Sequence, residues 1–549
     1  MRRRMRVRMA AGVVALAVAL IAAGCGGSGS GSGAKSADLL RIGTAGQIDS
    51  LNLFAAQHLQ ATELLHINYP SLIGHDASGR LIPDFATSWT YGPQFRTLTL
   101  KVHTNGKWSD GVPLTAKDVA FTLNLVARYG ATAAGLIGAY LPTVQRAEAP
   151  DPGTVVVHFR APSPTAISEL LWIPVLPEHV FGKLATGDGH LLTSFAAKTP
   201  LVGGGPFYVA SYTPKQVAIL NRNPYYYGPA PHVERIGFTL YSNPDALVQG
   251  FQNGEVDAVE RVPYSAVKTV QSGGAQVQEP LSFTELWLAI NDSPKATKHL
   301  ELHDLRVRHA FDLASDRDSI VRTAFFGSAA PGASVVPPTL PALRVNTAAP
   351  AFDIAQANQI LDQAGYKRGG NGIRVANGHP MSYKVISARD ATGAQESAFG
   401  ILQSDFRKIG VQLTLQELDA AAVAPALEGP KKDFSEFDLY LISYVGGYDS
   451  SDFNADIVCA GVAGGYTTTG TCDKKFDALD NTHLSAATQS ASLKAAQDEQ
   501  RYILTRRPLL VLAYVKNIYA VKPAWTGLTA GPLGWFLAGH QSAEEVREK

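Results

Sequence analysis

Apolar residues recur at helical spacing in several segments of the chain. They follow the i, i+3, i+4 and i+7 pattern that places one apolar stripe on a helix. The stripes are Val307, Ala310, Phe311 and Ala314; then Ala357, Ile360, Leu361 and Ala364; then Phe399, Leu402, Phe406 and Ile409. Asp304 stands where an N-cap belongs, and Gly365 and Gly410 follow the second and third stripes as stop signals. Three helices are predicted.

A fourth helix is predicted from its capping residues. Thr115 and Asp118 have the spacing of a capping box, in which the two side chains bind the first free amides of a helix. The helix would end near Gly130.

Strands are predicted between these helices. Leu98 to Val102 and Val411 to Leu415 alternate apolar and polar residues, and Leu509 to Tyr514 is a continuous apolar run typical of a buried strand. Helices that alternate with strands indicate an α/β fold with mixed sheets.

The N-terminus has the pattern of an export signal. Five arginines precede an apolar run from Met9 to Gly24, which is shorter than the roughly 20 residues of a membrane-spanning helix. Ala22 to Cys25 resembles the lipobox of bacterial lipoproteins, although Ala22 stands where leucine is usual. Residues 1–24 are therefore predicted to be a signal peptide and Cys25 a lipidated cysteine. An ordinary cleaved signal with an unrelated cysteine is the alternative.

Composition narrows the possible partners. The chain has 48 basic and 47 acidic residues, and five of the basic ones lie in the leader, which leaves 43 against 47. A mildly acidic chain argues against a nucleic-acid partner. Residues 25–38, after the leader, are rich in glycine and serine and are predicted to be a flexible linker.

The remaining two cysteines, Cys459 and Cys472, are predicted to form a disulfide in an oxidising compartment. Two reduced thiols or a metal pair are the alternatives.

Catalytic and metal motifs are weak. Ser265 and Lys268 fit Ser-x-x-Lys, but the partner motifs of penicillin-recognising enzymes are absent from the sequence, so an exported serine hydrolase or transpeptidase is only an alternative. His299 and His303 have the spacing of a helical metal pair, yet the cap at Asp304 places them before the helix. No enzyme activity, cofactor or metal site is predicted.

Short motifs recur in order along the chain. They are Leu81 to Trp89, Gly106 to Val119, Leu176 to Val180, Gly203 to Phe207, Asn221 to Tyr226, Gly254 to Asp257, Val307 to Ala310 with Asp316 and Arg317, Ala364 to Tyr366, and Lys408 to Val411. Together, over roughly residues 39 to 535, they resemble the family 5 extracellular solute-binding proteins. These proteins are the oligopeptide, dipeptide and nickel-chelate receptors of ABC importers.

The resemblance implies a two-lobed, type II periplasmic-binding-protein fold with an extra subdomain in lobe one. By analogy, lobe one is 39–283 with its subdomain at about 56–199, lobe two is 284–517, and 518–549 returns to lobe one. The two hinge crossings are expected near Trp287 to Asn291 and Val511 to Tyr514.

The resemblance also implies a ligand segment after the predicted strand near Leu439. Peptide-binding members carry a tryptophan there and, three residues later, an aspartate that pairs with the ligand's α-amino group; here these positions are Tyr444 and Gly447. Asp449 or Asp452 could replace the aspartate if the register shifts, and a solvated turn is the alternative. The expected ligand contacts are Thr44, Gly46, Gln47, Trp287, Tyr444, Gly446, Gly447, Tyr448, Asp449 and Asp452, although Trp287 also suits a core or lobe-interface position.

The sequence therefore predicts a monomeric, lipid-anchored extracytoplasmic receptor. It would capture a peptide or peptide-like solute and deliver it to an ABC permease and its ATPase subunits. The same fold binding a metal chelate or an oligosaccharide is the alternative.

Overall fold

The computed structural model describes residues 38–549, except 77, 134–136, 139, 391, 455, 465, 466, 536 and 538. The predicted signal peptide, Cys25 and nearly all of the predicted linker lie outside the described residues.

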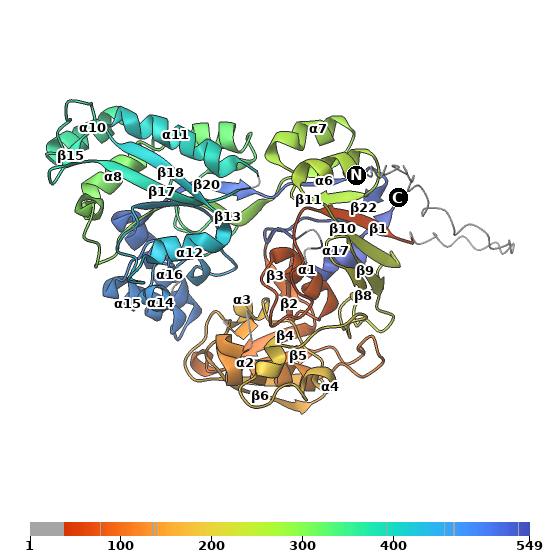
Figure 1. Cartoon of the computed structure of the whole chain (residues 1–549). Helices are drawn as coiled ribbons and strands as arrows, with labels where there is room; N and C mark the ends of the chain where they lie inside the picture. The colour runs from red at the N-terminus through yellow and green to blue at the C-terminus, as the bar shows by residue number, and fades with distance from the viewer. Residues whose placement is uncertain are drawn as a thin grey trace, which may run out of the picture. The chain divides into compact units, whose positions relative to one another are not determined.

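A seven-stranded mixed sheet forms the centre of the first lobe (Figure 1). Its strands, in spatial order, are β12 (Gln276–Gln278), β21 (Tyr519–Val521), β11 (Ala258–Glu260), β1 (Leu40–Thr44), β10 (Arg235–Leu240), β9 (Val217–Arg222) and β8 (Phe207–Thr213). β1 runs parallel to both β10 and β11, with Leu40 opposite Ile236, and the other neighbours are antiparallel. Helices α6 (Pro244–Gln252) and α7 (Val267–Ser272) share an apolar cluster with β11 and β21.

A four-stranded antiparallel sheet lies within the segment 56–199, for which an extra subdomain is expected. Its order is β4 (Ala86–Tyr91), β5 (Thr97–Val102), β7 (Thr154–Phe159) and β6 (Val144–Asp151). Its apolar side chains join those of β1, β8, β9 and α1 (Leu59–Asn68) in one core. The short elements of this region are β2 (Ile73–His75), β3 (Leu81–Pro83), η1 (Pro93–Phe95), α3 (Ala166–Leu170), α4 (Glu178–Phe181) and α5 (His190–Thr193).

Helix α2 (Ala116–Ala133) packs on the four-stranded sheet and has the predicted cap. The Thr115 hydroxyl accepts from the Lys117 amide at 3.3 Å, and Asp118 accepts from the Thr115 amide at 3.0 Å. Gly130 has φ 52°, where the regular helix is interrupted, close to the predicted end.

A six-stranded sheet forms the second lobe. Its order is β14 (Ala329–Pro331), β20 (Leu509–Lys516), β13 (Leu281–Ile290), β19 (Leu439–Val445), β17 (Ser382–Ala388) and β18 (Gln412–Leu418). Side chains of β13 alternate between its two faces. Leu286 and Leu288 pack with α8 (Leu305–Leu313), α10 (Ile354–Gln363) and α11 (Ala394–Lys408). Phe283 and Trp287 pack with α12 (Ala420–Glu428), α15 (Lys474–Leu484) and α16 (Gln489–Arg506).

The three predicted apolar stripes form α8, α10 and α11, and the Asp304 side chain caps α8 by accepting from the Arg306 amide. The other elements of this lobe are η4 (Leu300–His303), α9 (Arg317–Ser319), η5 (Ile320–Ala324), β15 (Val375–Ala376), β16 (His379–Pro380), α13 (Ser451–Asn454) and α14 (Cys459–Gly464). Helices therefore cover both faces of the sheet (Figure 1).

The chain passes between the two large sheets twice. It leaves the seven-stranded sheet at β12 and enters the six-stranded sheet at β13, and it returns from β20 to β21. The passages are therefore residues 279–280 and 517–518. The stretches near Trp287 and Val511 that the sequence favoured as crossings lie inside β13 and β20, because both strands are longer than their apolar pattern suggested.

After β21 the chain packs on the first lobe. β22 (Trp525–Thr526) pairs with β23 (Arg547–Glu548), and α17 (Gly539–Glu545) contacts α1. His540 lies 3.0 Å from a carboxylate oxygen of Asp84, and Tyr226 donates to Glu544 at 2.6 Å. None of the helices among the described residues has both the length and the apolar character needed to span a bilayer.

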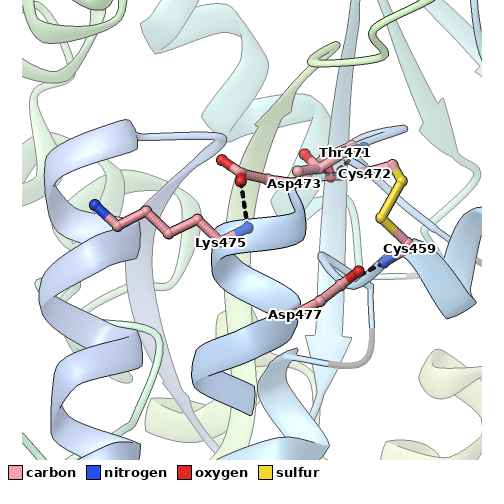
Figure 2. Close-up of a disulfide and its surroundings, with 7 residues drawn as sticks. Cys459, Thr471, Cys472, Asp473, Lys475 and Asp477 are labelled. Carbon is pink, nitrogen blue, oxygen red and sulfur yellow. Dashed lines mark hydrogen bonds between the residues drawn. A yellow bond between two sulfur atoms is a disulfide. The ribbon is translucent and has the colours of Figure 1, made fainter. Parts of the chain in front are cut away.

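Cys459 and Cys472 form the predicted disulfide (Figure 2). The Cys459 amide donates to Asp477 at 2.9 Å, and Asp473 caps α15 by accepting from the Lys475 amide at 2.9 Å. The bridge thus ties the start of α14 to the start of α15.

Candidate ligand-binding site

Two aromatic rings from neighbouring strands form the lobe-two part of the candidate site. Trp287 on β13 stacks on Tyr444 on β19, with ring centroids 4.0 Å apart and 12° between their planes. The antiparallel register places Glu285 opposite Tyr444, so Trp287 and Tyr444 are diagonal neighbours on one face. Trp287 is fully buried and Tyr444 is partly exposed.

Glu285 is a carboxyl group buried among these rings. The Trp287 Nε1 donates to its Oε2 at 2.5 Å, whereas its Oε1 has no hydrogen-bond partner. Burial raises the pKa of Glu285 well above its usual range, and the hydrogen bond from Trp287 and the attraction of Arg344 oppose this only in part.

The segment after β19 packs against the same face. The Gly446 amide donates to the Phe283 carbonyl at 3.0 Å, and the Tyr448 ring meets Phe283 edge to face at 4.7 Å. Tyr448 also lies 5.5 Å from the ring of His75 on β2, so this segment of lobe two contacts lobe one.

Asp449 is held by contacts within the protein. It lies 2.9 Å from His483 Nε2 and accepts from the Ser451 amide and hydroxyl at 3.0 and 2.7 Å. Although burial opposes its charge, the bond to His483 keeps the pKa of Asp449 below its usual value, and Asp449 in turn raises the pKa of His483 to about 9. Asp449 and Ser450 are buried, so they do not form a solvated turn.

Asp452 has fewer partners. Its carboxylate accepts from the Asp449 amide at 3.2 Å, and the residue is partly exposed. Burial, with repulsion from Asp449 and Glu169, raises the pKa of Asp452 to about 8. A Cβ built on Gly447 would fall on the Asp452 carboxylate. Asp452 therefore occupies the space next to the backbone of Gly447.

Lobe one contributes an aromatic group that the sequence analysis missed. Trp172 stacks on Tyr140 with centroids 5.3 Å apart and meets Trp535 edge-on at 6.0 Å. A Cβ on Gly447 would lie 3.3 Å from Trp172, which brings this group to the glycine segment of lobe two. Trp172 and Trp535 stand in loops, where no periodic pattern marks them.

Further carboxyl groups lie behind Asp452. Burial raises the pKa of Asp456 to about 7 and that of Glu499 to about 8, and it also raises the pKa of Glu169 on α3. Asn454 donates to Glu499 at 2.6 Å, and Glu169 accepts from Thr165. Several carboxyl groups here are uncharged or only partly charged. They can accept hydrogen bonds from a cationic ligand, and they would lose protons when the ligand binds.

Thr44, Gly46 and Gln47 are the ligand-binding residues expected near the N-terminus. The hydrogen bonds described for them do not reach this cluster. The Thr44 hydroxyl donates to Gln60 at 2.8 Å and accepts from the Gly46 amide at 3.1 Å, and Gln47 is exposed. These residues follow the end of β1, and the described bonds of Thr44 and Gly46 stay within lobe one.

The residues of the alternative enzyme hypothesis lie elsewhere. Ser265 and Lys268 are exposed, in η3 (Tyr264–Ala266) and α7. The described hydrogen bonds include none between their side chains; the Lys268 carbonyl accepts instead from the Ser272 hydroxyl at 2.8 Å.

Two α/β lobes joined by two passages of the chain, with aromatic side chains of both lobes packed in one cluster, have the architecture of a solute-binding protein. Residues 80–465, more than half of the chain, match the sequence model of the bacterial extracellular solute-binding proteins, family 5, middle region. The chain belongs to that family.

Relatives and solved structures agree with this assignment. A Brucella ovis protein, named provisionally an ABC transporter peptide-binding protein, is 28% identical over 396 residues, covering 70% of this chain and 69% of the relative. NikA from Brucella suis, solved with Fe(III)-EDTA, has a TM-score of 0.79 at 22% identity, with 93% of this chain and all of that chain covered. The oligopeptide-binding protein AppA from Bacillus subtilis, solved with a nonapeptide, has a TM-score of 0.74 at 20% identity and covers 94% of this chain and 99% of its own.

Proposed function

We propose that this protein is the extracytoplasmic receptor of an ABC importer and that it captures a peptide or peptide-like solute. The family assignment and the relative named as a peptide-binding protein support this proposal. The receptor would act by binding alone, as a monomer, and would deliver its solute to a permease driven by separate ATPase subunits.

The observation that carries the peptide proposal is the position of Asp452. Gly447 stands where peptide-binding members have the aspartate that pairs with the ligand's α-amino group, and the carboxylate of Asp452 fills the space beside Gly447. Asp449 is already bound to His483 and Ser451, whereas Asp452 is partly exposed and has few partners. Asp452 would therefore accept the α-ammonium group in a charge-assisted hydrogen bond, worth roughly 1.5 to 3 kcal/mol.

The ring surfaces suit the rest of such a ligand. Trp172 of lobe one and Tyr444 of lobe two are partly exposed, and the buried rings of Trp535 and Trp287 pack against them. A solute that touches both partly exposed rings would favour the state in which they lie together. The passages at 279–280 and 517–518 would be the hinge. Solution scattering would then show a smaller radius of gyration on saturation, and an unchanged radius would contradict hinge closure.

The binding test is native mass spectrometry of the full chain mixed with a peptic digest, a nickel–histidine complex and maltooligosaccharides. We expect adducts at peptide masses. Isothermal titration with a peptide found in this way, and with its N-acetylated form, then tests Asp452. The wild-type protein should bind the acetylated form at least tenfold more weakly, and Asp452→Asn should bind both forms about equally.

A metal chelate is the second candidate solute. NikA from Brucella suis, which shares this fold, was solved with Fe(III)-EDTA. Adducts of the nickel–histidine complex without peptide adducts would favour this candidate and overturn the peptide proposal.

We also propose that residues 1–24 are removed as a signal peptide and that Cys25 is acylated, so that the receptor is anchored to the bacterial cell membrane. Two acyl chains would be enough for stable anchoring. Metabolic labelling with palmitate should mark the wild-type protein and not the Cys25→Ser variant. A Cys25→Ser protein that stays in the membrane fraction would contradict the anchor.

A further inference from the structure

Three potential metal ligands meet on lobe two. They are His299 before η4, Glu301 within η4, and His379 on β16, and their ligand atoms lie within 4.8 Å of one another. The two imidazole rings meet edge to face, with centroids 5.1 Å apart. The solute-site residues described above are not members of this cluster.

Glu301 has a free oxygen that points into the cluster. Its side chain is 0% exposed, and Tyr383 on β17 donates to its Oε1 at 2.9 Å. Its Oε2 accepts no hydrogen bond, although it lies 3.8 Å from His379 Nε2. A buried carboxylate oxygen without a partner is costly, and a cation bound at Oε2 would remove this cost.

The two histidines are reachable from solvent. Their side chains are 21% and 38% exposed, and His299 lines a surface cavity of about 600 Å³. Asp438 lies 3.8 Å from His299 Nε2, on the side away from the 3.1 Å contact of Nδ1 with Glu301. This distance is too long for a hydrogen bond, so Asp438 adds negative charge beside the imidazole ring without fixing its orientation.

We propose that His299, Glu301 and His379 form a binding site for a divalent transition-metal cation, with zinc as the best match. Two imidazole nitrogens and one carboxylate oxygen are zinc ligands, and water would complete a four-coordinate shell. Bonds of about 2.0–2.2 Å place tetrahedral ligands about 3.3–3.6 Å apart, so small side-chain rotations bring the present atoms into range. The acidic groups Glu301 and Asp438 offset the nearby cations Lys298 and Lys384, which line the same cavity.

His303, the partner that sequence spacing offered to His299, lies outside this site. Its Nδ1 is 3.0 Å from Asp292, which also binds Arg308. The second histidine of the site is instead His379, which is 80 residues after His299 in the sequence. The β15–β16 hairpin brings it against η4. Bound zinc would link these two segments and stabilise this end of lobe two.

The test is equilibrium dialysis of the full chain, first stripped with EDTA, against zinc chloride, with the metal measured by mass spectrometry. The wild-type protein should retain one zinc ion per chain at about 10 µM free zinc. His379→Ala, on an exposed hairpin, and Glu301→Gln should each weaken binding at least tenfold. Cobalt bound in place of zinc should give visible absorption bands that both substitutions abolish.

Two control variants distinguish zinc binding at this site from zinc binding through His303 or at the solute site. His303→Ala removes a histidine equally close to Glu301 in the sequence and should leave zinc binding unchanged. Asp452→Asn should also leave it unchanged, so that failure of the solute proposal and failure of the metal proposal are distinguishable. Absence of zinc retention by the wild-type protein, or retention that His379→Ala and Glu301→Gln do not alter, would overturn the proposal.

Discussion

The carboxylate of Asp452 lies where a side chain on Gly447 would begin. A glycine five residues earlier in the chain thus makes room for an acidic group that α13 presents from the other side of the turn. An acidic group can therefore stand beside position 447 without being at that position in the sequence.

The first prediction concerns the pH dependence of ligand binding. The pKa of Asp452 is about 8 in the free protein, so at pH 6 the group is mostly protonated and must lose a proton to pair with an ammonium group. Affinity for a peptide with a free N-terminus should therefore rise more than tenfold from pH 6 to pH 8, as isothermal titration can measure. In Asp452→Asn the rise should vanish, and an equal rise in the variant would place the titrating group elsewhere.

The second prediction concerns the buried pair of Trp287 and Glu285. Trp287→Phe removes the donor to Glu285 Oε2 while Oε1 already lacks a partner, so the variant should lose about 2 to 4 kcal/mol of unfolding free energy in urea. Glu285→Leu in the same background removes the unpaired carboxyl and should restore part of the loss. A double variant less stable than Trp287→Phe would contradict this explanation.

The third prediction concerns His483. Its pKa is about 9 in the folded protein against about 6.5 unfolded, so its contribution is fully present below pH 6.5 and is lost as the pH rises through 9. That contribution is about 3 kcal/mol. Urea unfolding at pH 6 and pH 9 should show a smaller fall in stability for His483→Gln than for the wild-type protein.

The groups that face His483 are Asp449, Glu499 and Asp480. Burial raises the pKa of Glu499 and Asp480, so the ionisation of these two groups also lowers the unfolding free energy at high pH. Only the difference in unfolding free energy between the wild-type protein and His483→Gln therefore reports on His483. His232, which is exposed, is the control position for the same substitution. Equal pH profiles for wild type and His483→Gln would contradict the prediction.

The fourth prediction concerns the disulfide. Replacing Cys459 and Cys472 with serine opens a short loop in the unfolded chain. The variant should lose about 3 kcal/mol of unfolding free energy, the chain-entropy value for a loop of this length. Chemical unfolding under non-reducing conditions should show this loss. If dithiothreitol lowers the stability of the wild-type protein to that of the double variant, the effect belongs to the bridge; a further loss in the variant would show that the serines disturb the packing.

The sequence was informative where neighbours along the chain decide the structure. The helices α2, α8, α10 and α11 were predicted from apolar spacing and caps, because their hydrogen bonds and apolar stripes are local. The passages between the sheets were misplaced by several residues. A continuous apolar run marks a buried strand but carries no sign of the point where the strand leaves its sheet.

The site depended on contacts between distant segments. Sequence reasoning named Tyr444 and Asp452, but it did not point to Trp172, Trp535 or the proposed metal ligand His379. No local pattern distinguishes a loop tryptophan that packs at a lobe boundary from one that packs in a core.

The sequence by itself determined the α/β class and the membership in a solute-binding family, because periodicity, composition and ordered motifs are properties of the chain; it favoured the disulfide between Cys459 and Cys472, which the structure contains. Only the tertiary structure decided that Asp449 is bound to His483 while Asp452 is partly exposed, and that His379 rather than His303 joins His299 and Glu301. The reason is physical: the charge and partners of a polar group depend on which distant residues exclude water from it, and chain folding alone sets that environment.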